Sequence, residues 1–160
     1  MICFDTAPLI WGIQGKANKE QEYLVSRTNS YIRHLSKEKT KIILPAPVIA
    51  EYLVGFSAEE QKIQEEILQK YFIIVSFDYK AARLASELER AKSPRDIQAE
   101  FGIDRQNVKT DVQIVATAIV FGAHAIVSHD DHMKVIAGDR IKIIDVPSIS
   151  EQLPLQLPGS

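Results

Sequence analysis

The sequence predicts an α/β fold of three layers, α/β/α, in which helices cover both faces of a central, mostly parallel five-stranded sheet. Five short apolar segments alternate along the chain with longer segments whose apolar residues recur at helical spacing. Segments that are apolar throughout, such as Ala125–Val127, are typical of strands buried on both faces. The 160 residues suit one hydrophobic core. We therefore expect a single domain over residues 1–147 and a surface tail over residues 148–160.

Strands are expected where short apolar runs are bounded by polar or turn-forming residues. These runs occupy residues 1–5, 41–45, 72–75, 125–127 and 141–146. Helices are expected over residues 7–14, 18–39, 46–54, 58–70, 79–92, 94–101, 110–121 and 131–137. Residues 57–60, SAEE, have the form of a capping box, and Asp78 can cap the helix that follows it. We expect residues 102–108 to be an irregular link, with the next helix starting at Lys109 or Thr110.

Charge and composition restrict the class of protein. The formal net charge of −2 argues against a protein that coats nucleic acid by bulk attraction, but an enzyme acting on nucleic acid stays open. No apolar run approaches the roughly 20 residues needed to cross a bilayer, and we expect no signal peptide. The single cysteine, Cys3, lies in an apolar run and is expected to be a buried, inert thiol. These features favour a cytoplasmic protein without membrane association.

Four carboxylates stand where this architecture forms binding sites. Asp5 ends the first expected strand, and Asp130 lies just beyond the fourth. Glu51 lies in the apolar helix after the second strand, and Asp111 is expected in the first turn of the helix before the fourth. In open parallel sheets, sites form outside the carboxyl ends of the strands, near a change in strand order. The two helical carboxylates can face the same cleft.

Each of these carboxylates also has a structural explanation. Asp5 and Asp130 can cap the helices that follow them. Asp111 at a helix N-terminus is favoured by the helix dipole, which contributes about 0.3–1 kcal/mol. Glu51 is harder to explain in this way, because a lone carboxylate within an apolar segment needs a partner or a cation. Taken singly, none of the four supports a functional assignment.

Three segments together carry four motifs of a known family. FDTAPLI (4–10) resembles its opening strand, acid, hydroxyl residue and helix, and LPAPVIAEYLVG (44–55) resembles the second motif, with an acid on a helix after a Pro-bearing turn. KTDVQIVATAIVFGAHAIVSHDDHM (109–133) resembles the third and fourth motifs, in which an Ala-rich helix and a buried strand precede a Ser-x-Asp turn. The chain thus resembles a PIN-domain nuclease, the family that includes the toxins of VapC-like toxin–antitoxin pairs. This resemblance implies a PIN-like fold.

The resemblance also implies the residues of an active site. The acidic cluster, expected both to bind metal and to catalyse, would consist of Asp5, Glu51, Asp111 and Asp130. Thr6 and Ser128 would be supporting hydroxyl groups near the metal or its water. His132 stands where the family often has a further acid or a His, and Lys109 could contact a substrate phosphate, although a solvated lysine is the simpler interpretation.

This set of acids suggests both a cofactor and a reaction. Hard oxygen ligands select Mg²⁺ or Mn²⁺ over zinc, and such ions lower the pKa of a bound water and stabilise a leaving oxygen. The expected function is therefore that of a metal-dependent endoribonuclease, a hydrolase with an RNA substrate. It would be either the toxin partner of an antitoxin protein or an RNA-processing enzyme. The resemblance also implies a homodimer.

The same residues allow three other interpretations. His129 and His132 could form a transition-metal site with Asp130 and Asp131, but a lone His-x-x-His pair is weak evidence, and we expect neighbouring histidines and a helix-start carboxylate at Asp131. A PIN-like module could bind RNA or protein without cutting. A phosphatase or receiver-like domain is disfavoured because Asp5 does not open a D-x-D-x-[TV] motif, and the chain has no Gly-rich phosphate loop.

Overall fold

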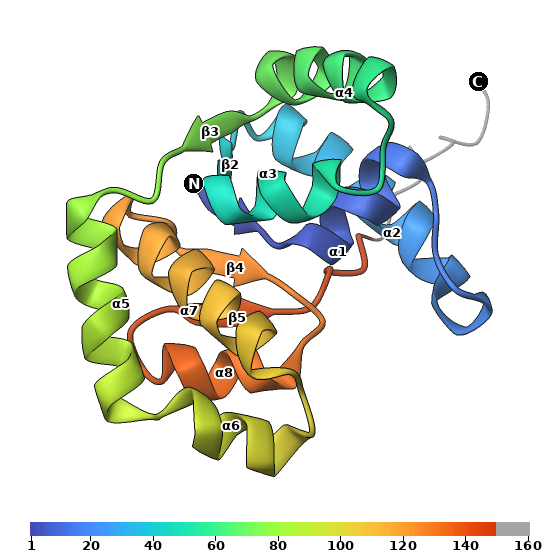
Figure 1. Cartoon of the computed structure of the whole chain (residues 1–160). Helices are drawn as coiled ribbons and strands as arrows, with labels where there is room; N and C mark the ends of the chain where they lie inside the picture. The colour runs from blue at the N-terminus through green and yellow to red at the C-terminus, as the bar shows by residue number, and fades with distance from the viewer. Residues whose placement is uncertain (150–160) are drawn as a thin grey trace, which may run out of the picture.

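A sheet of five parallel strands forms the centre of the protein in the computed structural model, which describes residues 1–149 (Figure 1). The order across the sheet is β3-β2-β1-β4-β5, and every neighbouring pair is parallel. The strands are β1 (Ile2–Phe4), β2 (Ile42–Pro45), β3 (Ile73–Val75), β4 (Ala125–Val127) and β5 (Lys142–Ile144). All five expected strands are thus confirmed. Most of the tail predicted over residues 148–160 lies outside the described residues.

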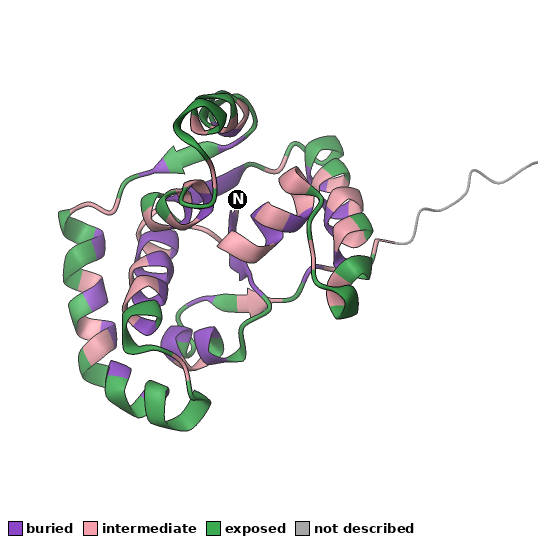
Figure 2. Cartoon of the chain, turned by 45° about the vertical axis from the view of Figure 1, so that its right-hand side comes forward, coloured by how far each residue is buried: buried purple, intermediate pink, exposed green. Residues whose placement is uncertain are grey.

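The central strands carry the hydrophobic core. Every residue of β2 and β4 is buried, whereas the edge strands β3 and β5 are largely exposed or half-buried (Figure 2). Cys3 in β1 pairs with Ile43 on one side and with Ile126 on the other, and all three are fully buried. Burial raises the pKa of the Cys3 thiol well above its ordinary value, as expected for an inert cysteine. Helices lie on both sides of the sheet, which confirms the three-layer α/β/α architecture (Figure 1).

The helices occupy most of the segments in which the sequence predicts them. They are α1 (Thr6–Leu9), η1 (Ile10–Gln14), η2 (Lys19–Gln21), α2 (Glu22–Lys37), α3 (Ala46–Leu53), α4 (Ala58–Tyr71), α5 (Tyr79–Ala91), α6 (Pro94–Phe101), α7 (Arg105–Val120) and α8 (Asp131–Ala137). Ser57 and Glu60 form the predicted capping box at the start of α4. The Asp78 side chain caps α5 by accepting a hydrogen bond from the Ala81 N–H.

The helix α7 begins earlier than the sequence pattern indicates. We expected an irregular link up to residue 108 and a helix that starts at Lys109 or Thr110. This expectation is wrong, because the helix starts at Arg105. Asp104 caps it by accepting a 2.7 Å hydrogen bond from the Gln106 N–H. In the first turn only Val108 is apolar and buried, and one such residue does not make the stripe that marks an amphipathic helix. Asp111 consequently lies in the second turn of α7, not in the first.

The segment after β1 is also less regular than predicted. In place of one helix over residues 7–14, a single α-helical turn, α1, continues as the π-helix η1. In η1, Gly12 lies so close to α2 that an added Cβ would stand 2.6 Å from the Ile32 Cδ1 atom. The lack of a side chain at Gly12 therefore allows η1 to pack on α2. The helix predicted from residue 18 begins as the 3₁₀ turn η2, with Asn18 as its cap.

The strand order reverses direction between β1 and β4. From β1 the chain moves outward to β2 and β3, and then returns to the other side of β1 to form β4 and β5. In parallel sheets such a reversal leaves a crevice outside the carboxyl ends of the two neighbouring strands. Those ends are occupied by Asp5 after β1 and by Ser128 after β4. Within residues 1–149, no helix has both the length and the apolar character needed to span a membrane.

Candidate active site

Asp5 lies at the carboxyl end of β1 and is almost completely buried, with 4% of the residue exposed. Its Oδ1 atom accepts a hydrogen bond of 2.7 Å from the Thr6 N–H, so it caps α1 as its position in the sequence allows. Its Oδ2 atom accepts a second bond of 2.7 Å from the Ser128 hydroxyl. Asp5 is therefore held by both strands that border the reversal in strand order.

Asp130 approaches Asp5 from the turn between β4 and α8. Its backbone N–H donates a 3.2 Å hydrogen bond to the Ser128 hydroxyl oxygen, so that Ser128 connects the two acidic residues. Asp130 is exposed, and although it occupies the N-cap position of α8, its side chain makes no capping hydrogen bond. Capping therefore does not account for the carboxylate of Asp130.

Glu51 reaches the same region from α3. Neighbouring residues Val48 and Tyr52 are buried in the core, whereas Glu51 is half-buried. The Thr6 hydroxyl donates a hydrogen bond of 2.5 Å to Glu51 Oε2. Thr6 thus contacts two acids at once, Asp5 through its backbone and Glu51 through its side chain. A carboxylate in an apolar helix requires a polar partner, and the partner of Glu51 is Thr6, a residue of the same acidic site.

Asp111 projects from the second turn of α7 and pairs with a buried histidine. Its Oδ2 atom lies 2.7 Å from His132 Nε2, and the exposed fractions of the two residues are 9% and 7%. Because the favourable effect of the helix dipole on a negative charge falls off within the first turn, the dipole is a poor explanation for a buried carboxylate at this position. The expected location of Asp111 at the start of the helix is wrong, but its place beside the other acids is as expected.

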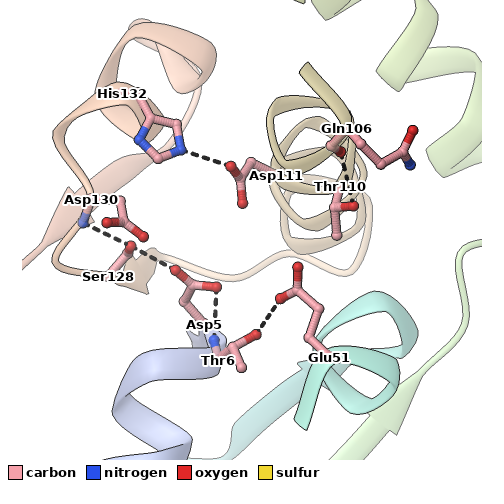
Figure 3. A network of polar contacts seen from close by, with 9 residues as sticks. All are labelled: Asp5, Thr6, Glu51, Gln106, Thr110, Asp111, Ser128, Asp130 and His132. Carbon is pink, nitrogen blue, oxygen red and sulfur yellow. Dashed lines mark hydrogen bonds and ion pairs between the residues drawn. The ribbon is translucent and has the colours of Figure 1, made fainter. Parts of the chain in front are cut away.

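The four carboxylates face one cavity, although they come from four different elements. Figure 3 shows Asp5, Glu51, Asp111 and Asp130 pointing towards a shared space, with Ser128 and Thr6 between them. The cavity has a volume of about 390 Å³. Its wall is made by Asp5, Thr6, Ala7, Ile10, Glu51, Ile103, Asn107, Asp111, Asp130 and His132. We call this space the carboxylate cavity.

Burial and mutual repulsion make two of these carboxylates hard to ionise. Burial raises the pKa of Asp5 to about 7, despite the hydrogen bonds that it accepts, and the negative charges of Asp111 and Asp130 add to the effect. Burial also raises the pKa of Glu51, again with a contribution from the same two acids. A group of acids with these properties has a high affinity for positive charge.

His132 contacts one of these acids, Asp111, and the pKa of its imidazole reflects that contact. Burial by itself lowers the pKa of the imidazole, but the hydrogen bond and the negative charge of Asp111 outweigh it, and Asp130 and Asp5 contribute further. The pKa of His132 is therefore raised above its ordinary value. The histidine contacts an acid of the cluster directly, as a neighbour of the site.

Comparison with known proteins identifies the fold family. The family model of the PIN domain matches residues 2–139, which is most of the chain. The chain belongs to the PIN domain family. PIN domains are in general metal-dependent nucleases. No similar sequence was found among curated proteins.

A solved structure agrees with the assignment to the PIN domain. A chain of "VapBC2 from Rickettsia felis bound to a DNA fragment from their promoter" superposes with a TM-score of 0.64 at 18% sequence identity. The match covers 91% of this chain and 98% of that chain. At this level of identity, the similarity shows that the two proteins share the PIN fold.

The residues of this PIN domain fit a hard divalent cation. Within residues 1–149, no group of three or more His, Cys, Asp or Glu side chains lies close enough together to hold a metal ion directly, and the four carboxylates surround a cavity instead. This arrangement suits Mg²⁺ or Mn²⁺, since Mg²⁺ keeps several waters and uses only one or two carboxylates. The raised pKa of the buried Asp5 is the chemical observation that favours a cation at this position.

The other predicted site residues lie outside the carboxylate cavity. Lys109 is half-buried on α7 and does not contribute to the cavity wall, so a contact with substrate phosphate stays a prediction. Asp131 is the first residue of α8 and bonds to Lys134, as expected for a helix-start carboxylate. His129 is exposed and pairs with Asp145, so it shares no ligand set with His132.

Sequence reasoning missed Asn107 and Ile103 in the cavity wall. Asn107 lies one helical turn before Asp111, and this spacing places the two on one face of α7. Because residues 102–108 were predicted to be an irregular link, the sequence did not place Asn107 and Asp111 on one helix face. Asp104, a good N-cap residue one position before Arg105, is the signal that would have revealed the earlier helix start.

Proposed function

We propose that the protein is an Mg²⁺- or Mn²⁺-dependent endoribonuclease that hydrolyses phosphodiester bonds of RNA in the carboxylate cavity. The observation that carries the proposal is the convergence of four carboxylates on one cavity at the reversal of strand order, where parallel sheets form their sites. Membership of the PIN domain family supports the same assignment.

Asp5, Asp111 and Asp130 are the principal residues that would hold the cation, either directly or through its bound waters. A bound cation would lower the pKa of a water molecule and stabilise the charge that develops on the leaving oxygen. Thr6 and Ser128 position the acids, because each donates its hydroxyl hydrogen to a carboxylate of the cluster. His132 fixes the orientation of Asp111 through their 2.7 Å contact.

Glu51 is the residue we assign to the attacking water, which it orients directly or by acting as a further ligand. Its raised pKa makes Glu51 a stronger proton acceptor than an ordinary carboxylate. In the hydrolytic step, the water oxygen forms a bond to phosphorus, the bond from phosphorus to one ribose oxygen breaks, and Glu51 takes the proton of the water. The leaving oxygen then receives a proton from solvent.

A protein partner forms the second part of the proposal. The structural similarity to VapBC2 from Rickettsia felis supports the idea that this chain acts as a toxin beside an antitoxin protein. A gene for a small DNA-binding protein immediately upstream, and co-purification of its product with this chain, would support the pairing. The homodimer and the cytoplasmic location stay predictions.

Cleavage of single-stranded RNA tests the enzymatic part. We expect the wild-type protein to cut RNA with Mn²⁺ or Mg²⁺ and to lose this activity in EDTA. Asp130→Asn is expected to reduce cleavage at least 100-fold, because it removes one acid of the cluster. Asp131→Asn is the matched control, since the neighbouring Asp131 is exposed and lies outside the cavity wall. RNA binding without metal-dependent cleavage would instead indicate a binding module.

A further inference from the structure

A second hollow adjoins the carboxylate cavity. Its volume is about 390 Å³, and its wall includes Trp11, Lys16, Gln21 and His129. Asp130 belongs to the walls of both spaces, as do Ala7 and Ile10. A chain molecule bound across the carboxylate cavity can therefore continue directly into this space, which we call the side hollow.

The ring of His129 is held in place at the edge of the side hollow. Its Nδ1 atom lies 2.7 Å from Asp145 Oδ1, and the ring of Trp11 meets it edge to face with 6.0 Å between the centroids. The side chain of His129 is nevertheless 41% exposed. An exposed aromatic ring fixed from two sides is a preorganised surface for stacking a planar group, because little conformational freedom is lost when that group binds.

The polar groups of the side hollow match a nucleotide. Lys16 is exposed, and within residues 1–149 its ammonium group forms no hydrogen bond or ion pair, although it lies near enough to Glu60 to help lower the pKa of that carboxyl. The side-chain amide of Gln21, in the wall of the hollow, forms no hydrogen bond in that part of the chain either. The ammonium group is suited to a phosphate. The amide of Gln21 can both donate to and accept from the edge of a base. Apolar walls with a few such polar groups are typical of sites for small planar ligands.

We infer that the side hollow is a subsite for one nucleotide of single-stranded RNA, next to the phosphate that is cut. The base stacks on His129, the amide of Gln21 contacts the edge of the base, and Lys16 contacts a backbone phosphate. A single strand is required because bases within a duplex are already stacked and paired. This inference rests on the proposed nuclease function, which brings the RNA to the neighbouring carboxylate cavity.

The only tryptophan of the chain provides a direct measurement of binding. Because Trp11 contributes to the wall of the side hollow, its fluorescence reports occupancy of this space. The experiment titrates the full chain with a single-stranded RNA pentanucleotide, with Ca²⁺ in place of Mg²⁺ so that hydrolysis is suppressed. We expect saturable quenching of Trp11 by the pentanucleotide and none by a blunt RNA duplex.

Variants of the side hollow separate stacking from bulk charge. His129→Ala is expected to weaken the affinity about tenfold, as for loss of one stacked base, and His129→Phe to restore it to within about threefold. Lys16→Ala is expected to weaken binding and to reduce its dependence on salt. The matched controls are His124→Ala and Lys80→Ala, at exposed positions outside the wall of the hollow. Gln21→Ala is expected to change the base preference next to the cleavage point in a randomised RNA.

Two outcomes distinguish this inference from the proposed function. If the wild type cuts RNA while the His129, Lys16 and Gln21 variants bind and cut it as the controls do, the subsite is wrong and the nuclease assignment stands. If the pentanucleotide quenches Trp11 in the wild type and binds His129→Ala more weakly than the controls, but no metal supports cleavage, the subsite stands and the nuclease assignment is wrong. The absence of both binding and cleavage overturns both.

Discussion

The hydroxyl group of Ser128 donates a 2.7 Å hydrogen bond to Asp5 Oδ2, joining two residues that are 123 positions apart in the chain. The same hydroxyl oxygen accepts a bond from the Asp130 N–H. Ser128 is 3% exposed, so neither contact is open to competition from bulk water. This single side chain therefore fixes the distance between the first and the fourth acid of the site.

Ser128→Ala is expected to impair both stability and activity. It leaves an oxygen of the buried Asp5 without a donor, which should lower the free energy of unfolding by about 1–3 kcal/mol. Cleavage should fall about 10- to 100-fold, as is common when a group that supports metal ligands is lost. Chemical denaturation and initial cleavage rates measure the two effects. Ser128→Thr keeps the hydroxyl and is the control. Equal activity of Ser128→Ala and the wild type would contradict the assigned role.

The stability of the metal-free protein should fall as pH rises from about 4 to about 7. In this range the folded state binds more protons than the unfolded state, because the pKa of Asp5 is raised from 3.8 to about 7. The expected loss attributable to Asp5 is on the order of 4 kcal/mol. Asp5→Asn should remove this component, so that the metal-free variant is more stable than the wild type at pH 7.5. Urea denaturation between pH 4 and pH 8 tests this prediction. If the free energy of unfolding depends on pH in the same way in the wild type and in Asp5→Asn, Asp5 does not cause the loss.

His132→Ala should destabilise the protein more at low pH than at high pH. The raised pKa of His132 means that its contribution is fully present below about pH 6.5 and is lost as pH rises through the folded-state value. At pH 6 the variant leaves Asp111 unpaired, with an expected cost of about 1–3 kcal/mol. Thermal unfolding at pH 6 and pH 9 makes the comparison. His132→Gln keeps a hydrogen-bond donor and should therefore lose less stability than His132→Ala. An equal loss of stability in the two variants would contradict the pairing of His132 with Asp111.

Asp104→Ala should loosen the first turn of α7. The variant lacks the oxygen that accepts the Gln106 N–H, and loss of such a cap costs about 1 kcal/mol. Asp104→Asn keeps an acceptor and should be close to the wild type. Hydrogen exchange of the Gln106 and Val108 amides, which bond to the Asp104 side chain and to the Asp104 carbonyl, is the suitable readout. If these amides exchange freely in the wild type, the helix begins later than the structure shows.

The central features of the fold could be predicted because they depend on local patterns. Each strand is a short apolar run that can be recognised without knowing which strands lie beside it. Ser57 and Asp78 are likewise local capping signals. The beginning of α7 escaped prediction because its first turn is mostly exposed and carries no apolar stripe. The π-helix after α1 escaped as well, since it depends on the packing of Gly12 against Ile32 of α2.

That the four acids surround one cavity could be predicted, but the contacts that they make could not. Asp5 and Asp130 follow strands that pair with each other, so the carboxyl ends of these strands bring the two acids to the same edge of the sheet. The pairing of Asp111 with His132, and the bond from Thr6 to Glu51, depend on how helices pack on the sheet. The same holds for the position of His129 beside Trp11, which no spacing in the sequence indicates.

Titration with Mn²⁺ tests most directly the claim that these distant carboxylates form one metal site. The measurement compares the affinity of the wild type, Asp111→Asn and Asp131→Asn for Mn²⁺ by calorimetry at pH 7.5. The structure predicts that Asp111→Asn binds at least tenfold more weakly than the wild type, because Asp111 faces the carboxylate cavity. Asp131→Asn should bind as the wild type does, since Asp131 lies outside the cavity wall. Equal affinities of the wild type and Asp111→Asn would show that the carboxylate cavity is not the metal site.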